Sequence, residues 1–309
     1  MHSKELVLGA LTVIAGVTNA YLWKGVLFAG GVQHAAFYLV PVFVLFIFSI
    51  LFALSALFIR YHLVRIATAV IAHVSGYLLI PFTATIGVAA VFSGIGGWIA
   101  VQDIAKEETA SQTFSMRKIL KSGMPLFFTA LALLFSVFYY SFAINHSSQG
   151  ILPKSLFNAA VPYMEKPIQG FLPGYRNNAT VDDLLLAFAT QQFGSSVDIK
   201  TLTPAEKAAL LAQGREALRA QFGIKLTGKE KASDVLSQVT NSQIEKFAGA
   251  NKQYLPIAAA IGFFIAIKAL TLPVFWITLI LTGLMVQLML KVGIVKREKV
   301  MVEIEKVNL

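Results

Sequence analysis

Long apolar stretches alternate with short charged segments along this chain. Aspartate and glutamate are absent from three of these stretches, namely 6–102, 109–164 and 246–297. A membrane-spanning helix needs about 20 consecutive apolar residues. The pattern therefore predicts a membrane part, a polar insert, a second membrane part and a charged tail, at 1–145, 146–253, 254–293 and 294–309.

The N-terminal membrane part contains apolar runs that predict spans near 6–30, 35–59, 66–82, 84–101 and 125–144. The third and fourth spans come from one run, Ile66 to Val101, which as a single helix would measure about 54 Å against a bilayer core of about 30 Å. Pro81 near its middle favours a hairpin of two short spans, and a single kinked helix is the alternative. The polar segment 102–124 is expected to form a loop or a short surface helix.

The C-terminal membrane part, Leu255 to Leu290, is interrupted only by Lys268 and Pro273. Two structures are compatible with its length: a hairpin of one short and one full span, or a single long helix. The two long runs together leave roughly five to seven crossings. The predicted fold is an all-α, polytopic membrane helix bundle of about six transmembrane segments with an inserted small helical domain.

Helix-capping patterns predict the elements of the insert. Thr203 to Glu206 supplies an N-cap, a first-turn proline and a capping-box glutamate, and Gly223 is the expected C-cap. A second box, Thr180 to Asp183, begins another helix, and an amphipathic segment covers about 231–247. Four prolines in 150–174 predict an irregular connector. One shared core is expected from Val181, Leu184, Leu185, Phe188, Leu210, Leu211, Ala217, Leu218, Phe222, Val235, Leu236, Val239 and Phe247.

Composition excludes a soluble globule, because 56% of the residues are hydrophobic and only 14% are charged. Soluble domains carry about 25% charged residues, so lipid must solvate part of the chain. The net charge of +10 comes largely from basic residues in short loops and at span ends, which indicates the positive-inside bias rather than a nucleic-acid interface. Those groups predict cytoplasmic termini and an extracytoplasmic insert. The alternative, in which 66–101 crosses once and 255–290 twice, places the insert in the cytoplasm and the basic residues of 102–124 outside it.

The chain has no cysteine, which excludes disulfides, thiolate metal sites and a cysteine nucleophile and favours a bacterial inner membrane. Neither a paired-histidine metal motif nor a phosphate-binding P-loop sequence occurs. The segment His73 to Gly76 differs from the Gly-x-Ser-Gly of rhomboid proteases at its first position. We therefore expect no catalytic, cofactor-binding or metal-binding residues and no enzymatic activity.

Few ionisable side chains fall inside the predicted spans, and none is a carboxylate. Lys24 and Lys268 are expected to extend to the membrane interface, and His34 to lie at a turn. His73 is expected to bond to a neighbouring helix. The glycines of 94–97 are expected to allow close helix packing rather than to bind phosphate.

The lack of buried carboxylates argues against ion-coupled transport. The favoured function is a non-enzymatic scaffold or a sensing and interaction protein that presents its helical domain at the membrane. Its expected partners are the lipid bilayer and a membrane protein or a second copy of the chain, and not nucleic acid. The alternative is a passive channel or uncoupled small-solute transporter lined by His73, Thr83 and the small residues of 87–97. An enzyme acting on lipid ranks third.

Overall fold

The computed structural model describes residues 3–28, 35–111, 114–145, 152, 154–172, 174–176, 178–193 and 202–295. These residues form helices and no strand, with one isolated bridge between Thr180 and Lys231. The predicted all-α class is therefore confirmed.

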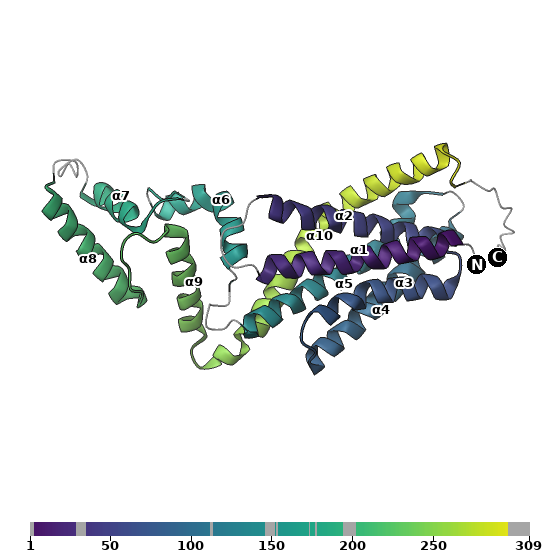
Figure 1. The fold of residues 1–309 in the computed structure, drawn as a ribbon, viewed down its shortest axis with the longest axis horizontal. Coiled ribbons are helices and arrows are strands. Elements are labelled where there is room, and N and C mark those ends of the chain that lie inside the picture. Colours follow the sequence, from purple (N-terminus) through teal and green to yellow (C-terminus); the bar gives the residue numbers. More distant parts are fainter. Residues whose placement is uncertain are drawn as a thin grey trace, which may run out of the picture.

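Six helices form an elongated bundle (Figure 1). They are α1 (Ser3–Phe28), α2 (Ala35–Phe58), α3 (His62–Val74) with its 3-10 continuation η1 (Ser75–Leu79), α4 (Ala84–Ala110), α5 (Met116–Asn145) and α10 (Leu255–Lys291). Among the described residues, six helical stretches are long and apolar enough to cross a membrane. The chain is a multi-pass membrane protein.

The long run from Ile66 to Val101 forms two helices that meet at a break over 80–83. Pro81 lies in this break, where its missing N–H interrupts no helical hydrogen bond. Thr83 caps α4 by accepting a hydrogen bond from the Ile86 amide at 3.3 Å. The helix then continues to Ala110, and α5 begins at Met116. Most of the segment 102–124 therefore belongs to these two long helices, and not to the expected loop or short surface helix.

The run from Leu255 to Leu290 lies within one helix, α10, of 37 residues. Its first half lies against α5, where the Ser136 hydroxyl donates to the Ala260 carbonyl at 2.5 Å and Tyr139 stacks on Phe263 at 4.7 Å. At 1.5 Å per residue α10 is about 55 Å long. It crosses the bundle obliquely (Figure 1), and even at a tilt of about 40° it would rise about 42 Å, so part of it extends beyond a hydrocarbon core of about 30 Å.

Helix α5 is the centre of the bundle and is packed against α1, α4 and α10. Gly123 makes this possible, because a Cβ at that position would lie 2.0 Å from the Ala100 carbonyl oxygen of α4. The ring of Phe127 contacts those of Phe48 and Phe52 of α2. Close backbone approach and interlocking aromatic rings therefore hold the bundle together.

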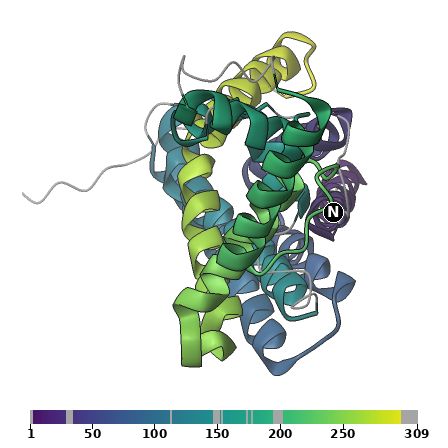
Figure 2. The ribbon, with the colours of Figure 1, turned by 90° about the vertical axis from the view of Figure 1, so that its left-hand side faces the viewer.

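The insert forms a helical domain at one end of the bundle, shown in front of it in Figure 2. Its elements are α6 (Lys154–Phe171), α7 (Val181–Phe193), α8 (Pro204–Phe222), α9 (Ala232–Ala248) and the 3-10 helix η4 (Gly249–Tyr254). The capping box of α8 and its C-cap Gly223, at φ 74°, are both as predicted. Helix η4 leads directly into α10.

The expectation of an irregular connector over 150–174 is wrong, because most of it is helix α6. The helix contains Pro162 and Pro167, each of which removes one backbone donor. Its apolar face compensates, since Val161 is buried with Tyr175, Ala179 and Ala232 in a core separate from that of the bundle.

Candidate functional site

An open apolar cleft of about 610 Å³ lies between α7, α8 and α9. It is lined by Leu172, Tyr175, Val181, Leu184, Leu185, Phe188, Ala189, Leu210, Gln213, Gly214, Ala217, Leu218, Gln221, Phe222, Ala232, Val235, Leu236 and Val239. Most of the side chains expected to form one closed core are in this lining. The helices are those predicted, but their apolar faces surround a space instead of filling it.

The predicted shared core is only partly formed. Helix α8 has no buried residue, and the Phe247 side chain of α9 is 97% exposed. Ala189 and Ala217 line the cleft with short side chains, whereas a Cβ at Gly214 would lie 2.9 Å from the Leu185 side chain. Helices α7 and α8 are therefore in contact at Gly214 and leave space elsewhere along their apolar faces.

Tyr175 is the one buried polar group in the wall of the cleft. Its side chain is 0% exposed, and its hydroxyl has no hydrogen-bond partner among the described residues. Burial raises the pKa of this phenol, so the hydroxyl keeps its proton and remains a donor. A buried donor without a partner is costly, and a ligand in the cleft would remove that cost only if the lining shifted to open the hydroxyl to it.

Polar contacts hold α7, α8 and α9 together on one side of the cleft. The Arg215 guanidinium of α8 lies 3.6 Å from the Asp182 carboxylate of α7 and also donates to the Thr227 carbonyl. The amide of Val181 donates to the Glu230 carbonyl at 3.0 Å, which joins the start of α7 to the segment before α9. These contacts fix the three helix ends, whereas the apolar faces between them stay apart.

Glu230 organises the turn that precedes α9. Its carboxylate accepts hydrogen bonds from the Thr227 amide at 2.8 Å, the Thr227 hydroxyl at 2.7 Å and the Gly228 amide at 2.8 Å. These donors stabilise the charged form, with those of Thr227 foremost, and lower the pKa of Glu230 to about 2.

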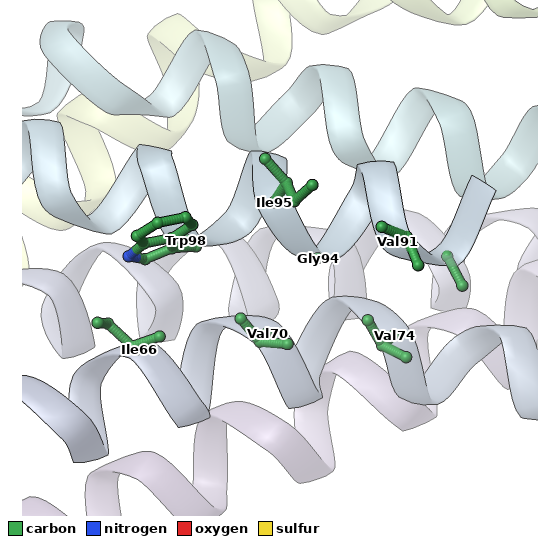
Figure 3. A pocket seen from close by; sticks show the side chains of 8 residues that line it. Ile66, Val70, Val74, Val91, Gly94, Ile95 and Trp98 are labelled. Atoms are coloured by element: carbon green, nitrogen blue, oxygen red, sulfur yellow. The ribbon is translucent and has the colours of Figure 1, made fainter. Parts of the chain in front are cut away.

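A second hollow, of about 390 Å³, lies in the membrane part between α3 and α4 (Figure 3). Ile66, Val70 and Val74 face Val91, Ile95 and Trp98 across it. Gly94 brings the helices close, because a Cβ there would lie 3.0 Å from the Val74 side chain. The lining is apolar apart from the indole N–H of Trp98, so it suits hydrocarbon better than a polar solute.

The two lysines of the spans bond to neighbouring helices. Lys24 donates to the Leu79 carbonyl at the end of η1, at 2.5 Å. Lys268 is half-buried within α10 and donates to the Pro125 carbonyl, at 3.1 Å, and to the Thr129 hydroxyl of α5. Lys268 lies well inside the single helix α10, level with Pro125 of α5, and its expected extension to the membrane interface stays a prediction.

His73 is fully buried, and its Nδ1 lies 2.8 Å from the Ala69 carbonyl of its own helix. This Nδ1 contact lies within α3, and the backbone of Phe127 in the neighbouring helix α5 also interacts with the ring. Gly97 of α4 lies against the same ring, because a Cβ at that position would be 2.7 Å from His73 Nδ1. The glycine therefore allows the two helices to pack closely. Thr83 is the N-cap of α4, and His34 lies outside the described residues.

Sequence reasoning missed two buried polar residues, Tyr175 and Asn19. Asn19 of α1 is 0% exposed, and neither of its amide atoms has a hydrogen-bond partner in the described part of the chain. An asparagine inside an apolar run was a signal available in the sequence, whereas the burial of Tyr175 depends on tertiary packing.

The described residues contain no group of three or more His, Asp or Glu side chains placed to hold a metal ion. What they offer instead is a semi-enclosed apolar cleft with one buried donor and a glutamine-bearing rim, which suits binding of an apolar ligand. Comparisons with protein-family models, curated proteins and solved structures find no match to this chain.

Proposed function

We propose that this protein is a non-enzymatic sensing and interaction protein, in which the bundle holds the helical domain at the membrane and the α7–α9 cleft binds an apolar ligand. The observation that carries the proposal is the cleft itself, with apolar faces of three helices directed at unfilled space. Burial of apolar ligand surface there would contribute about 25 cal/mol per Å².

The residues that line the cleft favour one class of ligand, an amphiphile with one long apolar part and a hydrogen-bond acceptor. Tyr175 supplies the buried donor, and Gln213 and Gln221 supply amide groups near the opening. An acyl or isoprenoid chain with a carboxyl, ester or hydroxyl group fits this description.

The helical domain, residues 146–253, is proposed to lie outside the cytoplasm of a bacterial inner membrane. Five of the candidate spans precede the domain and one follows it, so the domain and the two ends of the bundle's chain lie on opposite sides. Basic residues concentrate at the end opposite the domain, including Arg60, Arg65, Arg117, Lys118 and Lys121. This arrangement follows the positive-inside bias.

Photo-crosslinking tests the proposed binding. The full-length protein in lipid nanodiscs is exposed to a fatty acid carrying a diazirine near its chain end, and crosslinked peptides are mapped by mass spectrometry. Crosslinks are expected on α7, α8 and α9. Ala217→Phe fills the cleft and should reduce them severalfold, whereas Ala220→Phe, on the same helix but outside the lining, should not.

The role of Tyr175 is tested in the same assay. Tyr175→Phe removes one hydrogen bond and should weaken binding roughly 2- to 10-fold. Crosslinks spread evenly over the domain and unchanged by Ala217→Phe would contradict the proposal.

A second candidate is the passive channel or uncoupled transporter, favoured by Asn19. A fully buried amide without a described partner inside a membrane bundle marks a candidate solute path. Solute flux into vesicles containing the pure protein, abolished by Asn19→Leu, would establish the channel instead.

A further inference from the structure

The corner between the helical domain and the last span, residues 246–254, carries an unusual exposed aromatic residue. Phe247, at the end of α9, has 97% of its side chain exposed, the highest value among the large hydrophobic residues described. Tyr254, the last residue of η4, is 57% exposed. Leaving a side chain such as phenylalanine in water forgoes the favourable free energy of its burial.

Contacts between α5 and α10 place this corner at the edge of the bilayer. Lys268 of α10 contacts Thr129 of α5, whereas the earlier residue Ala260 contacts the later residue Ser136, so the two helices run antiparallel and the end of α5 at Asn145 lies near the level of η4 and the start of α10. Helix η4 immediately precedes α10, at the end of the bundle that faces the helical domain (Figure 1). The corner therefore lies where the last span leaves the hydrocarbon.

The orientation of α9 fits the same location. Helix α9 runs across the direction of the bundle helices (Figure 1), which is along the plane of a membrane that the bundle crosses. Its C-terminal end meets η4, and only seven residues separate Phe247 from the first residue of α10. The bilayer boundary is thus the nearest apolar phase to the exposed ring.

The charges of the corner are complementary to phospholipid headgroups. Lys246 and Lys252 are both exposed, and Lys246 makes a 3.4 Å bond to the Gln221 carbonyl. Glu245 is the last acid before a stretch without carboxylates that runs to Glu298. Aromatic rings at the headgroup level with lysines reaching the phosphates are typical of membrane interfaces.

We infer that residues 246–254 form a membrane-contact element, in which Phe247 and Tyr254 enter the headgroup–acyl boundary and Lys246 and Lys252 contact lipid phosphates. The element seats α9 on the bilayer and so fixes the orientation of the helical domain. It does not depend on which ligand the cleft binds.

The cysteine-free chain allows a direct test. Phe247→Cys and, as a matched control, Ala220→Cys on exposed α8 are labelled with an environment-sensitive fluorophore. Each protein is reconstituted in phosphatidylcholine–phosphatidylglycerol vesicles that contain lipids spin-labelled near the top of the acyl chain. The label at 247 should emit at shorter wavelength and be quenched severalfold more than the label at 220. Equal quenching at both sites would overturn the inference.

A second measurement avoids the label. Phe247→Asp should increase amide hydrogen exchange across 246–254 in vesicles, compared with Phe247→Leu, because a carboxylate draws the corner away from anionic lipid. The same exchange in both variants would show that the ring makes no membrane contact. Unchanged exchange in α5 serves as the control for an intact bundle.

Discussion

Thr203 shows how much one residue can specify locally. Its amide donates to the Glu206 carboxylate at 2.8 Å, and its hydroxyl accepts from the Glu206 amide at 3.3 Å. Thr203→Ala should lower the stability of α8 by about 0.5–2 kcal/mol, because one helix-end amide loses its partner. Native-state hydrogen exchange of α8 measures this. Thr203→Ser keeps the hydroxyl and should behave as the unchanged protein, so equal losses in both variants would contradict the role of the cap.

The lowered pKa of Glu230 predicts that the stability of the helical domain depends on pH. Its pKa is lowered to about 2 in the folded protein from an ordinary value of 4.5, so its carboxylate stabilises the fold above about pH 4.5. That contribution is lost as the pH falls through this range toward 2. Asp183 and Glu206, whose pKa values are lowered by capping threonines, act in the same direction.

Thr227→Val isolates the effect of Glu230. The substitution removes the hydroxyl donor and raises the pKa of Glu230 toward its ordinary value, so the acid-induced loss of stability should be smaller and should be complete at a higher pH. Thermal unfolding followed between pH 2 and pH 7 provides the comparison. Identical dependence of thermal unfolding on pH in both proteins would show that the Thr227 hydroxyl bond to Glu230 does not contribute to stability.

Predictability at the residue scale depends on how local the interaction is. The boxes at Thr180 and Thr203 involve residues three apart, and the sequence predicts both correctly. The partners of Lys268 are 139 and 143 positions away, and no periodicity identifies them. The sequence could not predict the unpartnered hydroxyl of Tyr175 either, because it results from packing of α6, α7 and α9 around one ring.

At the element scale, Gly249 sets the angle between α9 and η4. Its backbone has φ 51° and ψ −120°, a conformation open to glycine and strained for other residues. A Cβ at this position would meet nothing within 4 Å, so any penalty for Gly249→Ala is backbone strain, about 1–3 kcal/mol. Thermal unfolding in detergent should show this loss.

Gly262 provides the control for Gly249. It lies inside α10 and a Cβ there would also meet nothing within 4 Å. Gly262→Ala should therefore leave stability unchanged or raise it by up to about 1 kcal/mol, since alanine favours helix. A similar loss in both variants would indicate that the φ of Gly249 carries no strain.

Helix α6 illustrates why an element can be missed. Its prolines predict an irregular segment, yet Phe157, Val161, Ile168 and Leu172 recur at helical spacing and pack in the domain core. The apolar period was the better signal, because tertiary burial outweighs the cost of interior prolines.

At the scale of the whole molecule, the sidedness of the domain is testable. Single cysteines at Ser111, Ser196 and Asn308 in the cysteine-free chain are offered an impermeant maleimide on intact cells. Only the Ser196 position should react, because the basic ends of the spans are expected in the cytoplasm. Reaction at Ser111 with protection at Ser196 would reverse the proposed orientation.

Independent folding of the helical domain is a further expectation. Its core around Val161, Tyr175, Ala179 and Ala232 is separate from that of the bundle. Residues 146–253 expressed alone should therefore be soluble and predominantly helical by circular dichroism. A random-coil spectrum would mean that contact between α6 and α1 is required for folding.

Hydropathy was sufficient to predict the bundle, because each span of the first half must be apolar along its whole length. The open cleft could not be predicted in this way. The same apolar positions would serve a closed core or a binding site, and only the distances between α7, α8 and α9 distinguish the two.

The length of α10 has a mechanical consequence. A helix whose apolar length exceeds the bilayer core stands more upright in a thick membrane and leans further in a thin one. Helices α9, η4 and α10 follow one another without an intervening loop, and α9 supplies Val235, Leu236 and Val239 to the cleft wall. A change in bilayer thickness must therefore either bend the chain at Gly249 or widen and narrow the cleft.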